Sequence, residues 1–431
     1  MKPGMKAKMD VMIVGGGGRE HALAERLARS PRIGKLCALP GNGGIAALAE
    51  CVPIPATDLD ALVAFARERS IDFAVVAPDD PLVMGLVDRL EAAGVRCFGP
   101  NARAAAIEGS KVYAKDLMRR YGIPTARYEV FDDADRALAY AAAAGPVVVK
   151  ADGLARGKGV VVAEDADQAI TAVAAIMRDR IFGASGDRVL IEERLFGPEV
   201  SVLAFTDGRT IVPMVSSMDH KRAFDGDRGP NTGGMGAVAP NPHYTPELAE
   251  RCMRTIFRPT VEALRAEGRP FRGCLYFGLM LTADGPKVIE YNCRFGDPEA
   301  QAVLPLLESD LFEIMLAVRE ERLAEAEVRF SDGASCCVVM ASEGYPGKVR
   351  EGMEIHIDSG LPPDTVVYHS GTRRDGETLR TAGGRVLSVT AVAPTAGEAR
   401  SRAYAGVGLI HFEDARFRHD IGTAGGLSHD A

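Results

Sequence analysis

The sequence predicts an α/β protein of three parts: an N-terminal parallel α/β domain, a two-lobed α+β module and a small strand-rich C-terminal domain. Over the first hundred residues, strand and helix signals alternate from the apolar run Val11–Val14 to the strand Arg96–Phe98, as in a parallel sheet with crossover helices. From about Gly333 the chain is rich in strand signals again, with turn signals at Gly344–Gly347 and Gly383–Gly384. A chain of 431 residues exceeds one ordinary core, so roughly two to four domains are expected.

Three loops follow the strands of the first domain. Further strands are predicted at Lys35–Leu39 and Phe73–Ala77. Ligands of parallel sheets bind beyond the carboxyl ends of the strands, and here these ends carry Gly15–Gly18, Pro40–Gly44 and Ala77–Pro81. The helices predicted between the strands are one that ends at Ala28, Leu59–Arg69 and Pro81–Ala93.

The middle of the chain predicts antiparallel strands. After a helix at Ser110–Tyr121, the strands Pro146–Lys150 and Val160–Val162 are expected to pair around the glycine-rich turn Asp152–Gly159. The segment Ser216–Pro242 is expected to be a long loop. The other strands predicted here are Val189–Glu193, Glu199–Thr206, Thr210–Val215, Leu275–Thr282 and Lys287–Asn292.

The composition favours a globular cytoplasmic protein. Hydrophobic residues make up 47% of the chain and charged residues 26%, and no apolar run approaches the roughly 18–20 residues needed to span a bilayer. A net charge of −8 argues against a protein whose main partner is nucleic acid. The eight cysteines form no C-x-x-C pair, so we expect them to be reduced and mostly buried.

The glycine loop Gly15–Gly18 does not have dinucleotide-binding spacing. In G-x-G-x-x-G the third glycine would fall on Glu20 or His21, which argues against a nicotinamide-dependent oxidoreductase. What remains is either a tight turn or a nest of backbone N–H groups at a helix N-terminus, where Arg19 would add a contact to a phosphate.

A second glycine-rich segment carries two lysines between strands. Lys158 is followed by Gly159 and not by Ser or Thr, so the segment is not a P-loop. A flexible turn with Lys150 at the strand end and Lys158 in the loop suits a lid over a triphosphate. The alternative is a solvated hairpin.

A third segment places oxygen ligands on a strand. Alternate side chains share a face, so Glu290, Asn292 and Arg294 are expected to point together, opposite Tyr291 and Cys293. A carboxylate and an amide oxygen suit Mg²⁺, which completes its shell with phosphate oxygens and water. The alternative is a half-buried polar strand face.

Two polar loops, Asp219–Arg222 and Gly229–Gly236, offer further donors to a phosphate or carboxylate. His220 is more often a structural contact in such a loop than a proton shuttle.

In this order the motifs resemble the phosphoribosylamine–glycine ligase family of the ATP-grasp superfamily. The resemblance covers about residues 10 to 422. It rests on GGGGREHA at 15–22, PGN at 40–42, LxxFA at 62–66, FGP at 98–100, EGSK at 108–111, KADGLARGKGV at 150–160, DHKR at 219–222, GPNTGGMGA at 229–237, IEYNCRFGDPE at 289–299, YPG at 345–347 and GGRVL at 383–387.

The resemblance implies a ligase that uses ATP and Mg²⁺, with Mn²⁺ able to replace it. The reaction would join glycine to 5-phosphoribosylamine through glycyl phosphate and give glycinamide ribonucleotide, ADP and phosphate. Such chemistry depends on positioning and charge neutralisation more than on a protein nucleophile. The alternatives are another ATP-grasp carboxylate–amine ligase or carboxylase, and a non-catalytic nucleotide-binding regulator, in which Glu290 or Asn292 would be expected to have drifted to apolar residues.

Residue roles follow from the same resemblance. ATP would be bound by Lys111, Lys150, Lys158, Glu192, Glu193, Leu195 and Glu199, and the metal by Glu290 and Asn292. Arg294, Asp297 and Lys158 would serve catalysis. The substrates would lie among Gly17, Arg19, Asn42, Asp79, Pro81, Asp219, Lys221, Asn231, Thr232 and Gly233.

The resemblance also implies an organisation for the whole chain. The N-terminal (pre-ATP-grasp) domain would span 1–108, the ATP-grasp module 109–330 with a lid subdomain at about 125–195, and the C-terminal α+β domain 331–431. A monomer or weak dimer is expected. The chain departs from the family pattern at Asp79, where Glu is usual, and at Arg156, where a small residue is usual.

Overall fold

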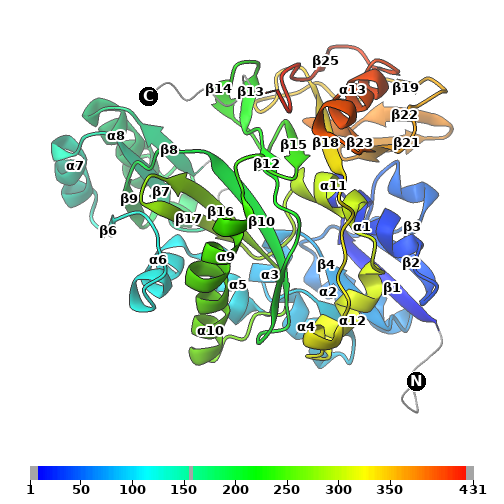
Figure 1. Ribbon diagram of the computed structural model, residues 1–431, viewed down its shortest axis with the longest axis horizontal. Coiled ribbons are helices and arrows are strands. Elements are labelled where there is room, and N and C mark those ends of the chain that lie inside the picture. The colour runs from blue at the N-terminus through cyan, green and yellow to red at the C-terminus, as the bar shows by residue number, and fades with distance from the viewer. Residues whose placement is uncertain (1–7, 155–158, 424–431) are drawn as a thin grey trace.

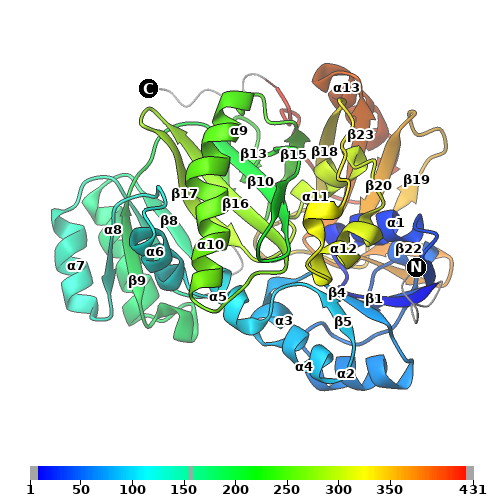
Figure 2. The ribbon, with the colours of Figure 1, turned by 60° about the horizontal axis from the view of Figure 1, so that its bottom comes forward.

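The computed structural model describes residues 8–154 and 159–423. Lys158 and Arg156 therefore lie outside the described residues. Within these ranges, the chain forms an N-terminal domain, a lid, a second lobe and a C-terminal domain, each built on its own sheet (Figures 1 and 2). No described helix has the length and apolar character needed to cross a membrane.

The N-terminal domain is a parallel sheet in the order β3-β2-β1-β4-β5. Its strands are β1 (Met9–Gly15), β2 (Ile33–Pro40), β3 (Glu50–Cys51), β4 (Phe73–Val76) and β5 (Arg96–Phe98), and its helices are α1 (Gly18–Ala28), α2 (Leu59–Glu68), α3 (Asp79–Val83) and α4 (Leu86–Ala92). The apolar residues of β1 are buried because helices cover both faces of the sheet. The prediction of one helix over Pro81–Ala93 was wrong. Gly85 has φ +86 in the left-handed region, which ends α3 before α4 begins.

Two helices lead from this domain to the lid. These are α5 (Ala102–Gly109) and α6 (Lys111–Arg120), capped by Asn101 and Ser110. The lid sheet has the antiparallel order β6-β9-β7-β8. Its elements are β6 (Tyr128–Phe131), α7 (Ala134–Ala143), β7 (Val147–Ala151), β8 (Val160–Ala163), α8 (Ala166–Val173) and β9 (Val189–Glu193). The predicted pairing of β7 with β8 is confirmed, from Val147 opposite Ala163 to Lys150 opposite Val160.

The second lobe is an antiparallel sheet in the order β11-β10-β16-β17. Its strands are β10 (Glu199–Thr206), β11 (Ile211–Pro213), β16 (Gly273–Thr282) and β17 (Gly285–Asn292), and its helices are α9 (Pro246–Cys252) and α10 (Arg258–Ala266), joined by the helical turn Met253–Phe257. The helices run across the sheet (Figure 2), where Phe257 packs on Phe277 with ring centroids 4.5 Å apart. Opposite Gly278 and Leu279, Ile289 forms a bulge in β17.

The expectation of a long loop at Ser216–Pro242 was wrong. The segment forms the short strands β12 (Met218–Asp219), β13 (Arg222–Phe224), β14 (Arg228–Asn231) and β15 (Gly236–Ala239). β13 and β14 make a hairpin, while β15 pairs with β18 of the C-terminal domain. Strands of two to four residues rich in glycine and polar residues have no periodic signal. Of these strands, β15 is stabilised by pairing with β18, about a hundred residues further along the chain, and β12 pairs in turn with β15.

The C-terminal domain is centred on the sheet β12-β15-β18-β23-β20, with β25 also on β18. Its elements are β18 (Ala334–Ser342), β19 (His356–Ile357), β20 (Thr365–His369), β21 (Thr372–Asp375), β22 (Thr378–Thr381), β23 (Arg385–Ala393), α13 (Ala396–Val407), β24 (Ile410–His411) and β25 (Ala415–Arg416). The chain reaches it through α11 (Glu299–Val303) and α12 (Leu311–Arg319). One buried apolar cluster includes Val11, Leu203, Phe312, Cys337 and Tyr368 and so joins three of the four sheets.

The cysteines behave as the composition predicts. All eight are unpaired, and all but Cys51 are buried.

Candidate active site

The carboxyl-terminal half of β17 presents polar side chains on one face. Glu290, Asn292 and Arg294 are half-buried, whereas Tyr291 and Cys293 are 3% and 1% exposed. This is the predicted alternation, and it runs undisturbed because the bulge at Ile289 lies before Glu290. The Asn292 Oδ1 atom accepts a hydrogen bond from the Arg294 guanidinium at 3.1 Å.

The charges of four cations act on the Glu290 carboxylate. Burial raises its pKa, but Lys221, Lys150, Lys111 and Arg294 together bring it below the usual value. The Lys221 Nζ atom lies 4.0 Å from Glu290 Oε1. Glu290 is therefore ionised at neutral pH, and the surplus of positive charge favours an anionic ligand beside it.

The donor set fits a hard divalent cation with few protein ligands. In the described part of the chain, no three His, Cys, Asp or Glu side chains cluster as a metal site would require. Glu290 and Asn292 supply two oxygen ligands at most, which matches the way Mg²⁺ is held between one or two protein groups and phosphates.

Lys150 lies at the end of β7 in a buried ionic cluster. Its Nζ atom is 3.0 Å from Glu192 Oε2 and donates to the Ile289 carbonyl at 3.1 Å. Lys115 shares Glu192 Oε2 at 3.2 Å and donates to Thr125. The second carboxylate oxygen of Glu192 is buried, with no hydrogen-bond partner in the described ranges. The cluster thus joins the lid to the bulge of β17.

Lys111 ties α6 to the base of the lid turn. Its Nζ atom donates to the Gly153 carbonyl at 2.7 Å, and Asp152 accepts from Ser110 and from the Val112 N–H. Burial lowers the pKa of Lys111, against the attraction of Glu290.

The segment predicted to bind adenine and ribose connects β9 to β10. Glu193 is paired with Arg127 at 2.8 Å and Lys287 at 3.5 Å, so its side chain is turned away from the lysine cluster on Glu192. Leu195 is half-buried, and Glu199 is exposed and lies 3.1 Å from Lys221 Nζ.

Glu108, which was not among the predicted site residues, is paired with Arg294. Its carboxylate lies 3.0 Å from the Arg294 guanidinium and accepts the Cys293 N–H at 2.7 Å. Burial opposes the charge of Arg294, but Glu108 and Asp79 raise the pKa of the guanidinium. In turn, burial raises the pKa of Asp79, while Arg294 and Arg19 bring it below the usual value. A glutamate at the end of the alanine-rich helix α5 was the available signal.

A cavity of about 380 Å³ lies where the N-terminal and C-terminal domains meet. Its lining comes from the glycine loop, the Pro40–Gly44 loop, Asp297 and the C-terminal domain: Gly16, Gly17, Gly41, Asn42, Asp297, Ser370, Gly371, Thr372, Ala382 and Arg385. The structure therefore brings together Gly17 and Asn42, predicted to bind substrate, and Asp297, predicted to serve catalysis.

Arg385, also missed, is central to this cavity. It lies 3.3 Å from Asp297 Oδ1 and donates to the carbonyls of Asp297 and Gly233 at 2.7 Å each. Burial raises the pKa of Asp297, but Arg385 and Arg19 lower it below the usual value. Only the GGRVL motif pointed to this residue.

The glycine loop is partly filled by its own side chains. Glu20 accepts the Gly17 N–H at 2.5 Å and pairs with Arg19, whose guanidinium also donates to the Phe295 carbonyl. Asn42 is likewise committed: its amide donates to the Gly16 and His369 carbonyls and accepts the N–H groups of Gly44 and Ile45. These side chains shape the cavity wall more than they reach into it.

Comparison with known proteins identifies the family. Family models match in chain order: Phosphoribosylglycinamide synthetase N domain over residues 9–108, ATP-grasp (A) domain over 109–300 and C domain over 335–424. A phosphoribosylamine–glycine ligase of Allochromatium vinosum is 50% identical over 422 residues, covering 96% of this chain and 98% of the relative. The chain belongs to the phosphoribosylglycinamide synthetase family.

Solved structures agree with this membership. The crystal structure of the Thermotoga maritima phosphoribosylamine–glycine ligase is 34% identical, has a TM-score of 0.84 and covers 96% of this chain and 100% of that one. The biotin carboxylase domain of a Hydrogenobacter thermophilus 2-oxoglutarate carboxylase, solved with MgADP, has a TM-score of 0.74 at 16% identity, with 96% of this chain and 92% of that one covered. The second likeness shows a shared fold alone. The predicted family and fold class are confirmed.

The remaining predicted substrate residues lie around the β13–β14 hairpin and α3. Thr232 donates to the Lys221 carbonyl, and the Gly233 N–H donates to the Tyr345 hydroxyl oxygen. Asn231 borders a larger cavity, of about 1290 Å³, between the lid strand β8, the hairpin and the C-terminal domain. Pro81 is buried in α3.

Asp219, one of the predicted substrate residues, has incomplete hydrogen bonding. Its Oδ1 atom is buried and has no partner among the residues that the structure describes. Burial and Glu299 raise the pKa of Asp219, against Lys221 and Arg385. Glu299, absent from the predicted set, is buried and accepts from the Tyr276 hydroxyl at 3.0 Å.

Proposed function

We propose that this chain catalyses the ATP-dependent ligation of glycine to 5-phosphoribosylamine, giving glycinamide ribonucleotide, ADP and phosphate. The observation that carries the ATP half is the Glu290 carboxylate beside Asn292, with Lys221 Nζ 4.0 Å away and with its pKa lowered, against burial, by Lys221, Lys150, Lys111 and Arg294. The substrate half is supported by the activity named for the full-length relatives.

Glu290 and Asn292 would hold the divalent cation, with Mg²⁺ as the physiological ion and Mn²⁺ able to replace it. When bound, the cation offsets charge on the phosphate oxygens and orients them. Lys111, Lys150 and Lys158 would hold the triphosphate. Glu192, Glu193 and Leu195 would border the adenine and Glu199 the ribose hydroxyls.

The reaction needs two displacements. The glycine carboxylate attacks the γ-phosphorus, the bond to the β-phosphate oxygen breaks, and ADP leaves. The amine of phosphoribosylamine then attacks the carbonyl carbon of glycyl phosphate, phosphate leaves, and the amine loses a proton. Arg294, fixed by Glu108 at 3.0 Å, would balance charge on the transferring phosphoryl group.

The second substrate, phosphoribosylamine, would occupy the cavity between the N-terminal and C-terminal domains. Its ribose phosphate would lie in the 380 Å³ cavity, near Gly17, Asn42 and Arg385. Asp297 faces the same cavity and its pKa is held low by Arg385 and Arg19, against burial. It is therefore an ionised carboxylate suited to orienting the incoming amine. Arg19, Asp79, Pro81, Asp219, Asn231, Thr232 and Gly233 would complete the substrate walls.

The direct test measures ADP and phosphate release with ATP, Mg²⁺, glycine and freshly generated phosphoribosylamine. We expect turnover to require both substrates and to stop when either is omitted. ATP turnover indifferent to glycine would contradict the assignment, and turnover with bicarbonate in place of glycine would favour a carboxylase.

A variant tests the metal assignment. Glu290→Gln removes the charged ligand and should reduce kcat/KM by at least about 100-fold, with little change in the free energy of unfolding. Glu377→Gln, in the exposed turn of the β21–β22 hairpin, is the matched control and should keep wild-type turnover. Near-normal activity of Glu290→Gln at limiting Mg²⁺ would overturn the role of Glu290.

We further propose that the protein is cytoplasmic and that it is a monomer or weak dimer. Sedimentation over a range of concentrations will test the oligomeric state.

A further inference from the structure

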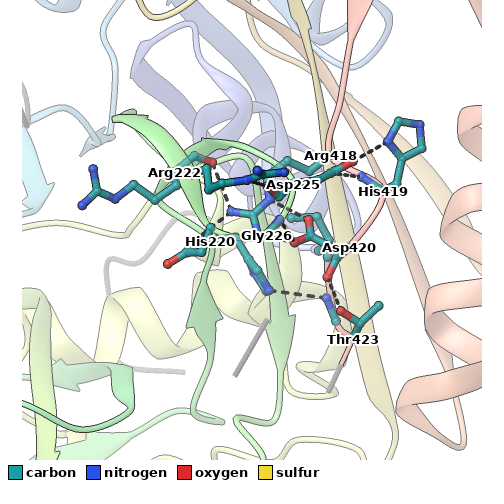
Figure 3. A network of polar contacts seen from close by, with 12 residues as sticks. His220, Arg222, Asp225, Gly226, Arg418, His419, Asp420 and Thr423 are labelled. Atoms are coloured by element: carbon teal, nitrogen blue, oxygen red, sulfur yellow. Dashed lines mark hydrogen bonds and ion pairs between the residues drawn. The ribbon is translucent and has the colours of Figure 1, made fainter. Parts of the chain in front are cut away.

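The C-terminal segment Arg418–Gly422 lies against the β13–β14 hairpin, almost two hundred residues earlier in the chain (Figure 3). Arg418 is 1% exposed. Its Nε and Nη2 atoms each lie 2.7 Å from an Asp420 oxygen, and Nη1 contacts Asp227 and the Arg222 carbonyl at 3.1 Å each. The guanidinium thus links Asp420 of its own segment to Asp227 and to the Arg222 carbonyl of the hairpin.

The turn of the hairpin is held from the same segment. Asp420 accepts the Gly226 N–H at 2.8 Å, and Asp225 accepts the His419 N–H at 2.7 Å and contacts its ring at 2.9 Å (Figure 3). The Gly226 contact holds the backbone of the turn, and the Asp225 contacts hold a side chain of the turn.

The segment is itself attached firmly to the C-terminal domain. From α13, the Tyr404 hydroxyl donates to the Arg418 carbonyl at 2.7 Å and accepts the Ile421 N–H at 3.0 Å. Arg400 donates to the carbonyls of His419 and Ile421. The segment is therefore an anchored strap between α13 and the hairpin.

Lys221 lies between two anchored neighbours. His220 receives the Gly422 N–H at 3.5 Å, and the Arg222 carbonyl receives Arg418 at 3.1 Å. From this position the Lys221 ammonium lies 3.1 Å from Glu199 and 4.0 Å from Glu290. The strap thus holds the residues on either side of Lys221, while the Lys221 carbonyl accepts from Thr232, and together these contacts set the position from which the ammonium extends.

We propose that Arg418 and Asp420 are positioning residues, which fix the hairpin so that Lys221 points at Glu290 and Glu199. Through them the C-terminal domain helps to build the ATP site. Burying the Arg418 guanidinium is costly even beside Asp420 and Asp227, whose side chains are 19% and 40% exposed, and apolar packing would stabilise the same contact at least as well. The ionic cluster is therefore better explained by the geometry that it imposes. Because the role of Lys221 rests on the proposed function, the test includes a measurement that does not need turnover.

The experiment is a double-mutant cycle in the full-length protein with Arg418→Met, Lys221→Met and the double variant. Each is assayed for kcat and for binding of Mg²⁺ with a non-hydrolysable ATP analogue. We expect Arg418→Met to reduce kcat or analogue affinity by about 10-fold or more, and to add little in the Lys221→Met background. Effects that multiply would show that Arg418 does not act through Lys221 and would overturn the proposal.

Two further variants separate positioning from folding. Arg418→Lys keeps the charge but not the forked geometry, so it should recover only part of the loss. Arg350→Met removes an exposed ion pair with Glu413 on the same domain and should leave kcat and affinity unchanged. If Arg418→Met does not fold, Asp225→Asn at the half-buried hairpin turn carries the same cycle.

The two proposals fail differently. A wild-type protein without glycine-dependent turnover would contradict the proposed function, whereas the cycle on analogue affinity would still decide the role of Arg418. Additive losses in analogue affinity would refute the positioning role even if glycine-dependent turnover were normal.

Discussion

Lys150 and Lys221 both face Glu290, but the protein holds them in different ways. Lys150 is 4% exposed, and its ammonium is fixed by the buried carboxylate of Glu192 and by the Ile289 carbonyl. The Lys221 side chain is 35% exposed and its ammonium is paired with the exposed Glu199. Its backbone, however, is flanked by two contacts to the C-terminal segment.

The difference separates stability from function. The Lys150 cluster lies wholly within the ATP-grasp module and leaves a buried carboxylate dependent on its cations, so it serves folding and ligand binding together. Lys221 adds little to folding, because solvent screens its ion pair. Its geometry comes instead from a scaffold in another domain. One site therefore combines a cation fixed by its own charge partners with a cation fixed through the backbone.

The largest effect is expected for Lys150→Met. It leaves Glu192 buried with Lys115 as its remaining cation, and removal of one partner from a buried ion pair costs about 3–5 kcal/mol. Loss of a charge aimed at the phosphates should also reduce kcat/KM by at least about 100-fold. Urea unfolding and steady-state kinetics measure both. Lys35→Met, on the exposed start of β2, is the control, and an unchanged free energy of unfolding in Lys150→Met would break the comparison.

Lys221→Met should show the opposite balance. We expect kcat/KM to fall by about 10- to 100-fold, while the free energy of unfolding changes by less than about 1 kcal/mol, the range for exposed ion pairs. The same two measurements apply. A loss of stability as large as that of Lys150→Met would show that Lys221 belongs to the folding core after all.

The sequence was enough to predict Lys150 as a site residue at the end of β7, but not the residues that surround it. Alternation along a strand was enough to place Glu290, Asn292 and Arg294 on one face, because the bulge at Ile289 lies just outside that run. The glycine-rich turn likewise identified Lys150. Both signals are local, so one sequence without its fold contains them.

The partners of these residues come from distant positions. Glu108 meets Arg294 across 186 residues and Arg385 meets Asp297 across 88, and neither glutamate nor arginine has a periodic signature. The strands β12 to β15 were missed for a related reason, since β15 is stabilised by pairing with β18. Tertiary pairing, which no local pattern encodes, therefore decides the surroundings of Lys221.

A change in acid sensitivity is also expected at the Lys221 anchor, through His220. Burial and Arg418 lower the pKa of His220 to about 4, whereas an unfolded histidine titrates near its ordinary value of about 6.5. Between these pH values the unfolded chain binds a proton that the folded chain does not. The free energy of unfolding therefore falls as pH drops from about 6.5 to about 4, by up to about 1.4 kcal/mol per pH unit for this residue.

His21 and His369, which pack against each other between α1 and β20, act in the same direction. Burial lowers their pKa values to about 3 and about 4.

His220→Asn should therefore reduce the slope of the free energy of unfolding against pH without abolishing it. Urea unfolding at intervals between pH 4 and 6.5 measures that slope in both proteins. Because only the slope is compared, a constant loss of stability in the variant does not matter. Identical slopes would mean that His220 titrates alike in both states and that the contact to Gly422 is open to solvent. The C-terminal segment would then hold the hairpin only at its turn and at the Arg222 carbonyl. The backbone of Lys221 would be flanked by one contact to that segment instead of two, so its position would depend less on the C-terminal domain.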